Sequence, residues 1–181
     1  MKPRILLDDN KFNLTILRLC HQLIENHRKF ENSAIIGVQQ VGVHLARRIH
    51  DIITAEIGSN VDLGLLDTTF HRDDFRRSDT ILTPSETQLN FQIENKRIIL
   101  VDDVLYTGRT IRAALDALID YGRPLDVELL VLVDRRLFRN LPIQAKYVGK
   151  TIDSIESEQV KVEWKEKEGT DKIWILPANE N

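Results

Sequence analysis

Apolar residues recur along the chain at spacings that change from one segment to the next, and each spacing predicts a different element. Over residues 10–29 they fall three or four positions apart, which is typical of an amphipathic helix. Its expected buried face holds Leu14, Leu17, Cys20, Leu23, Ile24 and His27. Asp8, Asp9 and Asn10 precede this helix and are residue types that favour a helix N-cap.

Four short apolar runs predict buried strands, at residues 34–38, 61–70, 97–101 and 126–133. Helical patterns follow the first run after Gly42 and the third run over residues 110–121. Because strands alternate with helices, we expect an α/β fold with a largely parallel sheet. No repeat or linker interrupts the pattern, so we expect one domain over residues 1–181.

Two further apolar runs predict a C-terminal hairpin over about residues 159–177. Trp164 and Trp174 are expected to pack on the body or on another subunit, as a cross-strand aromatic pair, and the charged run KEKEGTDK between them to form a solvated turn. Residues 71–90 are polar and have no clear period. A loop of this length in a compact domain is more often functional than idle.

Composition narrows the class of protein. The chain has 181 residues, 42% hydrophobic and 29% charged, with a net charge of -3. These values exclude a collagen-like or low-complexity chain and argue against disorder. The slightly negative net charge also excludes the class of nucleic-acid-binding domains that have a strongly basic overall composition. Residues 151–181 carry a net charge of -4 and the first 150 residues +1, so the body remains slightly basic.

Cysteine use and hydropathy point to a cytoplasmic protein without a membrane partner. Cys20 is the only cysteine, and no Cys/His cluster has the spacing of a zinc site. No apolar run has the length of a signal peptide or of a membrane span.

The segment from Ile98 to Thr110, IILVDDVLYTGRT, carries the clearest chemistry. An apolar strand delivers Asp102 and Asp103 to its carboxyl end, and a turn of small hydrogen-bonding residues then opens a helix. Free N–H groups at a helix N-terminus form an anion site, which Gly108 lets an anion approach closely. A phosphate site beside two carboxylates fits a phosphorylated sugar. Capping of the next helix is the alternative for a bare Asp-Asp pair, but the strand before it and Thr-Gly-Arg-Thr after it favour the ligand site.

This segment resembles the phosphoribosyl-pyrophosphate (PRPP) motif of type I phosphoribosyltransferases. Its sequence VDDVLYTGRT is similar to that found in the family of pyrimidine-operon regulators that are also uracil phosphoribosyltransferases. The similarity covers most of the chain, including residues 72–74, 120–124, 131–135 and 141–150, and weakens after about Thr151.

The resemblance implies transfer of ribose 5-phosphate from PRPP to a base, with Mg²⁺ carried by PRPP and no direct protein ligand to the metal. Asp102 and Asp103 would bind the ribose hydroxyls and stabilise positive charge on the sugar. Arg72 would close over the leaving pyrophosphate from a lid at residues 71–90. The implied PRPP-binding residues are Asp102, Asp103, Val104, Leu105, Tyr106, Thr107, Gly108, Arg109 and Thr110, with 107–110 holding the 5-phosphate. The implied pyrophosphate loop is Gln39, Gln40 and Val41, and the implied base-binding residues are Val133, Asp134 and Arg135.

Position 106 informs the choice of base. Purine-using relatives usually carry Asp there, whereas this chain has Tyr106, as the pyrimidine regulators do. The resemblance therefore favours uracil, giving UMP and pyrophosphate, over hypoxanthine or guanine.

The sequence departs from the family in the pyrophosphate loop and on the RNA face. Val41 stands where a cation is usual, which removes a charge-assisted bond unless Arg72, Arg76 or Arg77 compensates. Arg18 and His21 match the family's RNA-binding helix, and Arg139 follows in a loop with fewer cations than usual. Fewer cations predict weaker, more salt-sensitive binding of a pyrimidine-operon leader mRNA. Arg18 and His21 can also be ordinary helix-surface residues.

Two alternatives to this reading stay open. One is an RNA-binding attenuation regulator with little catalysis that uses PRPP or a nucleotide as effector. The other is a phosphoribosyltransferase for another base without an RNA role. Relatives form dimers and higher assemblies, so a homo-oligomer is expected.

Overall fold

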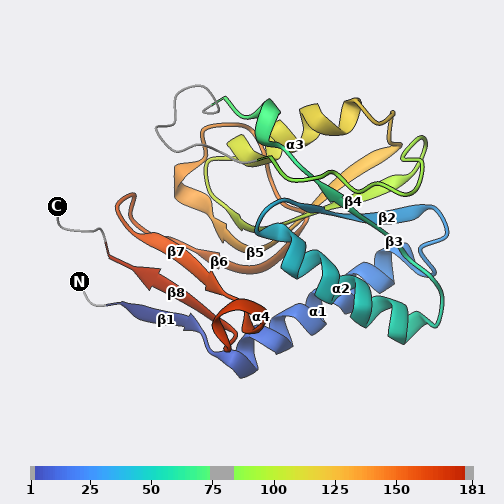
Figure 1. Cartoon of the computed structure of the whole chain (residues 1–181). Coiled ribbons are helices and arrows are strands. Elements are labelled where there is room, and N and C mark those ends of the chain that lie inside the picture. The colour runs from blue at the N-terminus through green and yellow to red at the C-terminus, as the bar shows by residue number, and fades with distance from the viewer. Residues whose placement is uncertain (1–2, 74–83, 178–181) are drawn as a thin grey trace.

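The computed structural model describes residues 3–73 and 84–177 and is built around a five-stranded parallel sheet (Figure 1). In sheet order the strands are β3 (Asp62–Leu66), β2 (Ser33–Val38), β4 (Arg97–Leu105), β5 (Asp126–Arg135) and β6 (Tyr147–Ile152). All four neighbouring pairs are parallel, as the alternation of strands and helices predicts.

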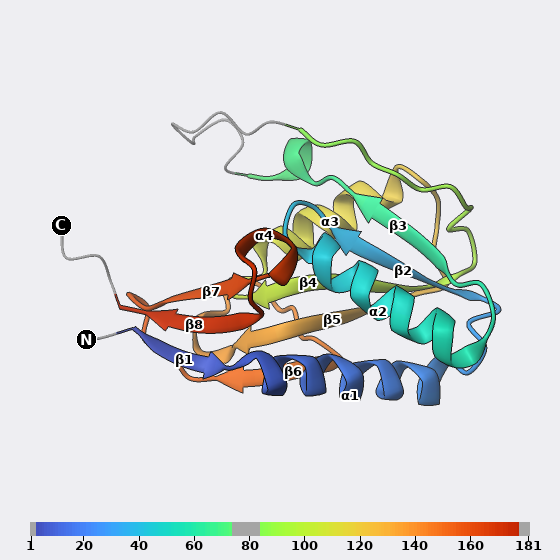
Figure 2. The ribbon, with the colours of Figure 1, turned by 60° about the horizontal axis from the view of Figure 1, so that its bottom comes forward.

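Helices cover both faces of this sheet, which is why its strands are apolar on both sides (Figure 2). α1 (Asp9–His27) and α2 (Gly42–Ile57) pack on one face, against Ile35, Ile99 and Leu130. α3 (Arg109–Ile119) packs on the other face with alternate residues of the same strands, among them Ile36, Leu100 and Leu129. The sheet is thus the middle of three layers.

α1 begins after Asp8, whose side chain accepts a hydrogen bond from Lys11 N at 3.0 Å, so the predicted N-cap region is confirmed. Part of the predicted buried face is wrong. Leu14 is 65% exposed and Leu17 39% exposed, while Cys20, Leu23 and His27 are buried as expected. A second apolar set with the same spacing, Phe12, Ile16 and Leu19, turns inward because it includes the large ring that fills the core.

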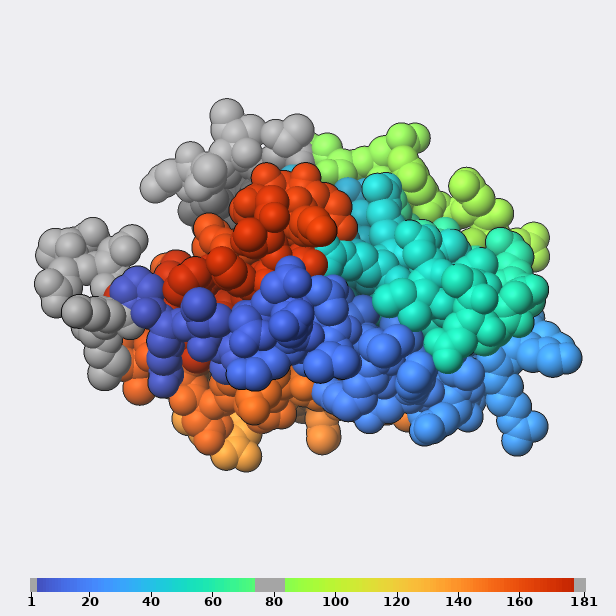
Figure 3. All heavy atoms as spheres, turned by 90° about the horizontal axis from the view of Figure 1, so that it is seen from below, coloured from blue at the N-terminus to red at the C-terminus, as the bar shows by residue number. Residues whose placement is uncertain are grey.

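The two C-terminal strands and one N-terminal strand form a second, three-stranded sheet, in the order β1-β8-β7. β7 (Gln159–Glu163) pairs antiparallel with β8 (Lys172–Leu176), and the short helix α4 (Lys165–Glu168) lies between them. β1 (Arg4–Leu7) completes the sheet. This strand is not predicted from the sequence, because its four residues are too few to show a periodic pattern. Figure 3 shows α1 on one face of the molecule, beside α2 and these C-terminal strands.

The charged run is exposed over residues 165–170, as expected, but the prediction of a simple turn is wrong, because the run begins with α4 and is anchored to α2. Arg48 of α2 donates to Asp171 at 2.7 and 2.8 Å and to Glu166 at 2.7 and 2.8 Å. Its guanidinium lies 5.1 Å from the ring centroid of Trp164, which is 1% exposed and packs edge-on against Phe12. Trp174 lies opposite Lys161, so the expected pairing with Trp164 is also wrong.

The second predicted strand, over residues 61–70, ends early. β3 stops at Leu66, and Thr69–His71 form a 3₁₀ helix, η1, that turns the chain toward α3. On its return the chain runs beside β3, where Leu65 and Gln88 exchange backbone hydrogen bonds of 2.8 and 2.9 Å. No helix in the described part of the chain has the length and apolar character needed to cross a bilayer.

Candidate active site

The site lies at the carboxyl edge of the sheet, where the order of strands reverses. From β2 the chain crosses to β3 on one side, and β4 then returns to the other side of β2. Loops after β2 and β4 therefore leave the sheet in opposite directions and open a crevice between them, the usual ligand site of open α/β sheets. The predicted pyrophosphate loop and the PRPP motif are these two loops.

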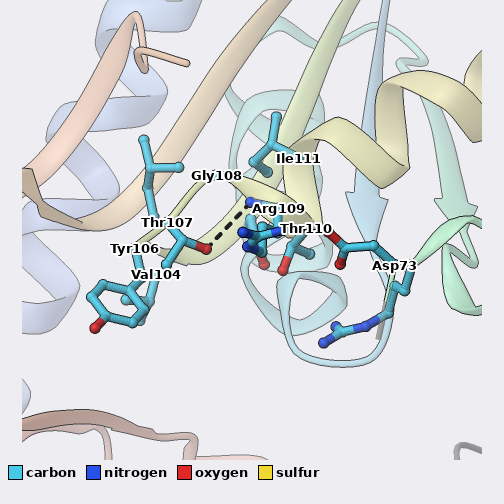
Figure 4. A pocket seen from close by; sticks show the side chains of 11 residues that line it. Asp73, Val104, Tyr106, Thr107, Gly108, Arg109, Thr110 and Ile111 are labelled. Carbon is cyan, nitrogen blue, oxygen red and sulfur yellow. Dashed lines mark hydrogen bonds and ion pairs between the residues drawn. The ribbon is translucent and has the colours of Figure 1, made fainter. Parts of the chain in front are cut away.

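Two adjoining cavities occupy this crevice. The larger, of 610 Å³, is lined by residues of the turn between β4 and α3 (Figure 4). Its lining comprises Arg72, Asp73, Asp102, Val104, Leu105, Tyr106, Thr107, Gly108, Arg109, Thr110 and Ile111. The smaller, of 240 Å³, is lined by the loop after β2, by residues 67–69 and by the end of β4. Arg72, Asp102, Val104 and Thr110 line both, so the two cavities form one site.

The turn after β4 presents the N-terminus of α3 to the larger cavity. Gly108 has φ +91°, a left-handed conformation that favours glycine, and α3 starts at the next residue without a side-chain cap. Thr107 Oγ1 accepts from Arg109 N at 3.4 Å, and both side chains face the cavity in Figure 4. The first-turn N–H groups of α3, two threonine hydroxyls and the Arg109 guanidinium, which pairs with Asp73, are donors of the kind that bind anions.

Asp102 and Asp103 stand between the cavities in different surroundings. Asp102 is 7% exposed, and its Oδ1 accepts from Asp103 N at 3.0 Å. Asp103 is half-buried and lines the smaller cavity, with Oδ1 accepting from Val104 N at 2.7 Å. Burial, and then the neighbouring Asp103 charge, raise the pKa of Asp102 well above its usual range. Burial raises the pKa of Asp103 to about 6.

The predicted pyrophosphate loop walls the smaller cavity. Gln39, Gln40 and Val41 all line it, and the peptide bond between the two glutamines is cis. Gln39 N donates to Leu66 O at 2.9 Å, which fixes the loop against the end of β3. Gly42 then starts α2 so close to β4 that a Cβ there would lie 2.5 Å from Val101 O and 3.2 Å from Asp102 Oδ1.

Arg72 is brought to both cavities, as the predicted role over the leaving group requires. Its neighbour Asp73 forms an ion pair with Arg109, and Arg112 donates to His71 O at 3.0 Å. Residues 71–73 are therefore held against the phosphate turn and α3. Arg76 and Arg77, and most of the predicted lid, lie outside the described residues.

The predicted base-binding residues lie behind the larger cavity rather than in its wall. Val133 is fully buried, and Asp134 is paired with Arg139. Arg135 is 6% exposed, donates to Ser154 Oγ at 2.8 Å and lies 4.0 Å from the centroid of the Tyr106 ring. Arg135 therefore reaches the cavity only through Tyr106, whose ring it contacts and which lines the cavity wall.

The three predicted RNA-binding residues are engaged at separate places. Arg18 donates to the carbonyls of Val148 and Gly149 at 3.1 and 2.6 Å, and His21 Nε2 lies 3.1 Å from Glu56 Oε1. Arg139 donates to Tyr106 O and Asp134 at the site itself. Arg18 and His21 remain exposed on α1.

Sequence reasoning missed Asp67, Thr68 and Thr69, which line the smaller cavity. Their signal was the position of a carboxylate directly after a buried strand, the same signal as in the PRPP motif. This signal is not visible in the sequence, because the apolar run over residues 61–70 predicts a strand that includes Asp67.

Comparison with known proteins agrees with this geometry. The phosphoribosyl transferase domain model matches residues 5–167. The chain is 46% identical over 169 residues to the Bifunctional protein PyrR of Desulfosudis oleivorans, covering 93% of each chain. It is 41% identical over 179 residues to that of Actinobacillus pleuropneumoniae, covering 98% of each.

Solved structures share the fold at low sequence identity. The hypoxanthine phosphoribosyltransferase of Trypanosoma cruzi superposes with a TM-score of 0.70 at 14% identity, covering 97% of each chain. That of Staphylococcus aureus gives 0.68 at 20% identity, covering 98% of this chain and 93% of the other. The chain therefore belongs to the phosphoribosyl transferase domain family, among its PyrR members.

Proposed function

We propose that this chain is a PRPP-dependent uracil phosphoribosyltransferase, which converts uracil and PRPP to UMP and pyrophosphate and also regulates pyrimidine genes by binding mRNA. The observation that carries the proposal is the end of β4, where two carboxylates adjoin a helix N-terminus without a side-chain cap. One domain spanning residues 1–181 performs the reaction, and the family match over 5–167 supports this extent.

Each part of PRPP has a complementary surface. The 5-phosphate binds at Thr107, Gly108, Arg109 and Thr110, through N–H groups, hydroxyls and the guanidinium. The ribose lies over Asp102 and Asp103, whose carboxylates accept from its hydroxyls. The diphosphate enters the smaller cavity, between the Gln39–Val41 loop and Arg72.

Mg²⁺ fits this site as an ion carried by the diphosphate. Asp102 and Asp103 offer oxygen atoms beside the smaller cavity, the ligand type that Mg²⁺ prefers. Among the described residues no cluster of three or more His, Cys, Asp or Glu side chains could hold a metal ion. When bound, Mg²⁺ neutralises charge on the departing pyrophosphate.

The protein's own groups stabilise the transition state. As the bond at C1 of ribose breaks, positive charge develops on the sugar, and the ionised carboxylates of Asp102 and Asp103 lie beneath it. Such fixed charges act strongly because the site is partly buried and they need no reorganisation during the reaction. Arg72 lines both cavities and supplies positive charge for the leaving group.

Tyr106 supports uracil as the base. Its ring is held between Arg135, at 4.0 Å from the centroid, and Phe138, at 6.2 Å between centroids. It therefore presents an apolar, aromatic wall where purine-using relatives carry a carboxylate. The test is a purified-protein assay with Mg²⁺, PRPP and either uracil or hypoxanthine; nucleotide formation from hypoxanthine but not from uracil overturns the choice of base.

RNA binding rests on the relatives' name, Bifunctional protein PyrR, and on the exposed Arg18 and His21 of α1. The exposed Leu14 and Leu17 on the same helix support a homo-oligomer, a dimer or higher. We place its action in the cytoplasm, on the single cysteine and the absence of a signal-like run in the sequence. A gel shift with a pyrimidine-gene leader RNA at stated salt tests the RNA role. Unchanged binding after Arg18→Ala and His21→Ala together would remove this face from it.

A further inference from the structure

Asp67 directly follows β3 and lines the smaller cavity, yet both of its carboxylate oxygens are directed at protein donors. Oδ1 accepts from Thr69 N at 3.2 Å and from Thr69 Oγ1 at 2.7 Å. Oδ2 accepts from Ser85 N at 3.2 Å. One side chain therefore links the chain leaving β3 to the chain returning toward it.

The backbone around Asp67 extends this link to the pyrophosphate loop. Asp67 N donates to Thr87 Oγ1 at 3.0 Å, and Gln39 Nε2 donates to Glu86 O at 2.6 Å. Gln39 N donates to Leu66 O at 2.9 Å. The returning segment 85–88 is thus bonded both to the end of β3 and to the loop after β2.

The same link reaches Arg72 on the other side. Thr69 begins η1, and its carbonyl accepts from Arg72 N at 3.4 Å. Asp73, next along the chain, pairs with Arg109 of the phosphate turn. Asp67 therefore lies where the pyrophosphate loop, the returning segment and the segment carrying Arg72 meet.

We infer that Asp67 is a positioning residue for diphosphate binding, which it supports by holding the Gln39–Val41 loop and Arg72 around the smaller cavity. This inference rests on the proposed function. A carboxylate would repel a diphosphate directly, and both its oxygens already accept hydrogen bonds, so Asp67 acts through its neighbours rather than as a ligand.

The test compares inorganic pyrophosphate with UMP, each in the presence of Mg²⁺, by calorimetry on the full chain. Pyrophosphate reports the smaller cavity, while UMP reports the phosphate turn and the ribose site. Asp67→Asn keeps one acceptor oxygen but turns an N–H group toward a backbone donor, so we expect pyrophosphate affinity to fall about tenfold or more. Affinity for UMP should stay within about twofold of the wild type.

Thr87→Val separates positioning from charge. It removes the acceptor for Asp67 N but leaves the Asp67 side chain unchanged, and we expect pyrophosphate affinity to fall about three- to tenfold. Asp62→Asn is the matched control, since Asp62 begins the same strand and pairs with Lys96 at 2.7 Å away from both cavities. Its affinities for both molecules should equal those of the wild type.

Unchanged or tighter pyrophosphate binding in Asp67→Asn or in Thr87→Val would overturn the inference. So would equal loss of pyrophosphate and UMP, because a general structural role predicts that result. A wild-type chain that binds neither pyrophosphate nor UMP contradicts the proposed function itself, and this outcome is distinguished by the wild-type titration alone.

Discussion

At the scale of single residues, the site depends on two neighbouring carboxylates that share one stretch of strand but not one environment. Asp102 is 7% exposed and beside the start of α2, while Asp103 is half-buried at the smaller cavity. Burial raises the pKa of both groups. In the proposed reaction their ionised forms stabilise a positively charged sugar, so protonation would remove this electrostatic contribution.

The pH dependence of catalysis follows from this shift. Burial raises the pKa of Asp103 to about 6, so below that pH the free enzyme carries a neutral side chain there. We expect kcat/KM for PRPP to fall as pH drops through about 6, and not at the pH near 4 of an ordinary aspartate. Initial rates from pH 5 to 8 measure it, with circular dichroism as the control for folding. A flat profile down to pH 5 would contradict the assigned role.

At the scale of elements, the contact between α2 and β4 couples the pyrophosphate loop to Asp102. A Cβ at Gly42 would approach Val101 O to 2.5 Å, so only glycine allows the helix to start there. Gly58 ends the same helix at φ +63°, with nothing within 4 Å of its would-be Cβ. These two glycines share a helix, but only one of them adjoins the site.

Replacement of each glycine by alanine distinguishes site geometry from stability. Gly42→Ala should cost about 1–3 kcal/mol of unfolding free energy through overpacking and lower kcat/KM for PRPP by about tenfold or more, because α2 must move from β4. Gly58→Ala should cost about 1 kcal/mol through its left-handed backbone while leaving kcat/KM unchanged. Denaturant titration and initial rates measure both; equal activity in the two variants would refute the coupling.

The elements that the sequence predicted well are those whose signal is local. The PRPP motif joins an apolar strand, a glycine turn and a helix within residues 98–119, and all three are found there. The face of α1 was harder, because apolar residues lie on two of its sides and only packing on the sheet selects Phe12 over Leu14. Asp67 was missed, and the contacts of Arg135 behind Tyr106 were not predicted, because their partners, Ser85 and Ser154, are distant in the sequence.

At the scale of the whole molecule, the edge of the sheet opposite the site carries a buried polar network. Glu128 accepts from Arg97 and Lys146 at 2.6 and 2.7 Å, and from Tyr147 at 2.6 Å. His27 at the end of α1 lies 3.0 Å from the same carboxylate. Residues of β4, β5 and β6 are thereby joined to α1 at the amino ends of these strands, whereas the ligand cavities lie at the carboxyl end of β4.

Loss of this network should lower stability without changing the site. Glu128→Gln replaces the buried carboxylate that accepts from half-buried Arg97, exposed Lys146 and buried Tyr147, and we expect it to cost about 1.5–3 kcal/mol of unfolding free energy. Asp153→Asn, which breaks the exposed pair with Arg136, should have no measurable effect on stability. Denaturant titration measures both variants, and equal stabilities would refute the role of the network.

The same network sets the response to acid. Burial alone would raise the pKa of Glu128, but hydrogen bonds from Lys146, Tyr147 and Arg97 outweigh it and lower the pKa to about 2. Because the pKa of Glu128 is lower in the folded than in the unfolded chain, its ionised form stabilises the fold above the unfolded pKa of 4.5. This contribution to stability is lost as the pH falls from 4.5 toward 2. The wild type should lose stability over this range more steeply than Glu128→Gln, as thermal unfolding at each pH would show.

We propose that the carboxylates and the phosphate turn after β4 perform phosphoribosyl transfer. The most direct measurement is an assay of wild type and Asp103→Asn with Mg²⁺, PRPP and uracil, following UMP and pyrophosphate together. We expect the wild type to form both products in equal amounts and the variant to be slower by about a hundredfold or more. No product from the wild type, or wild-type rates from Asp103→Asn, would contradict the account.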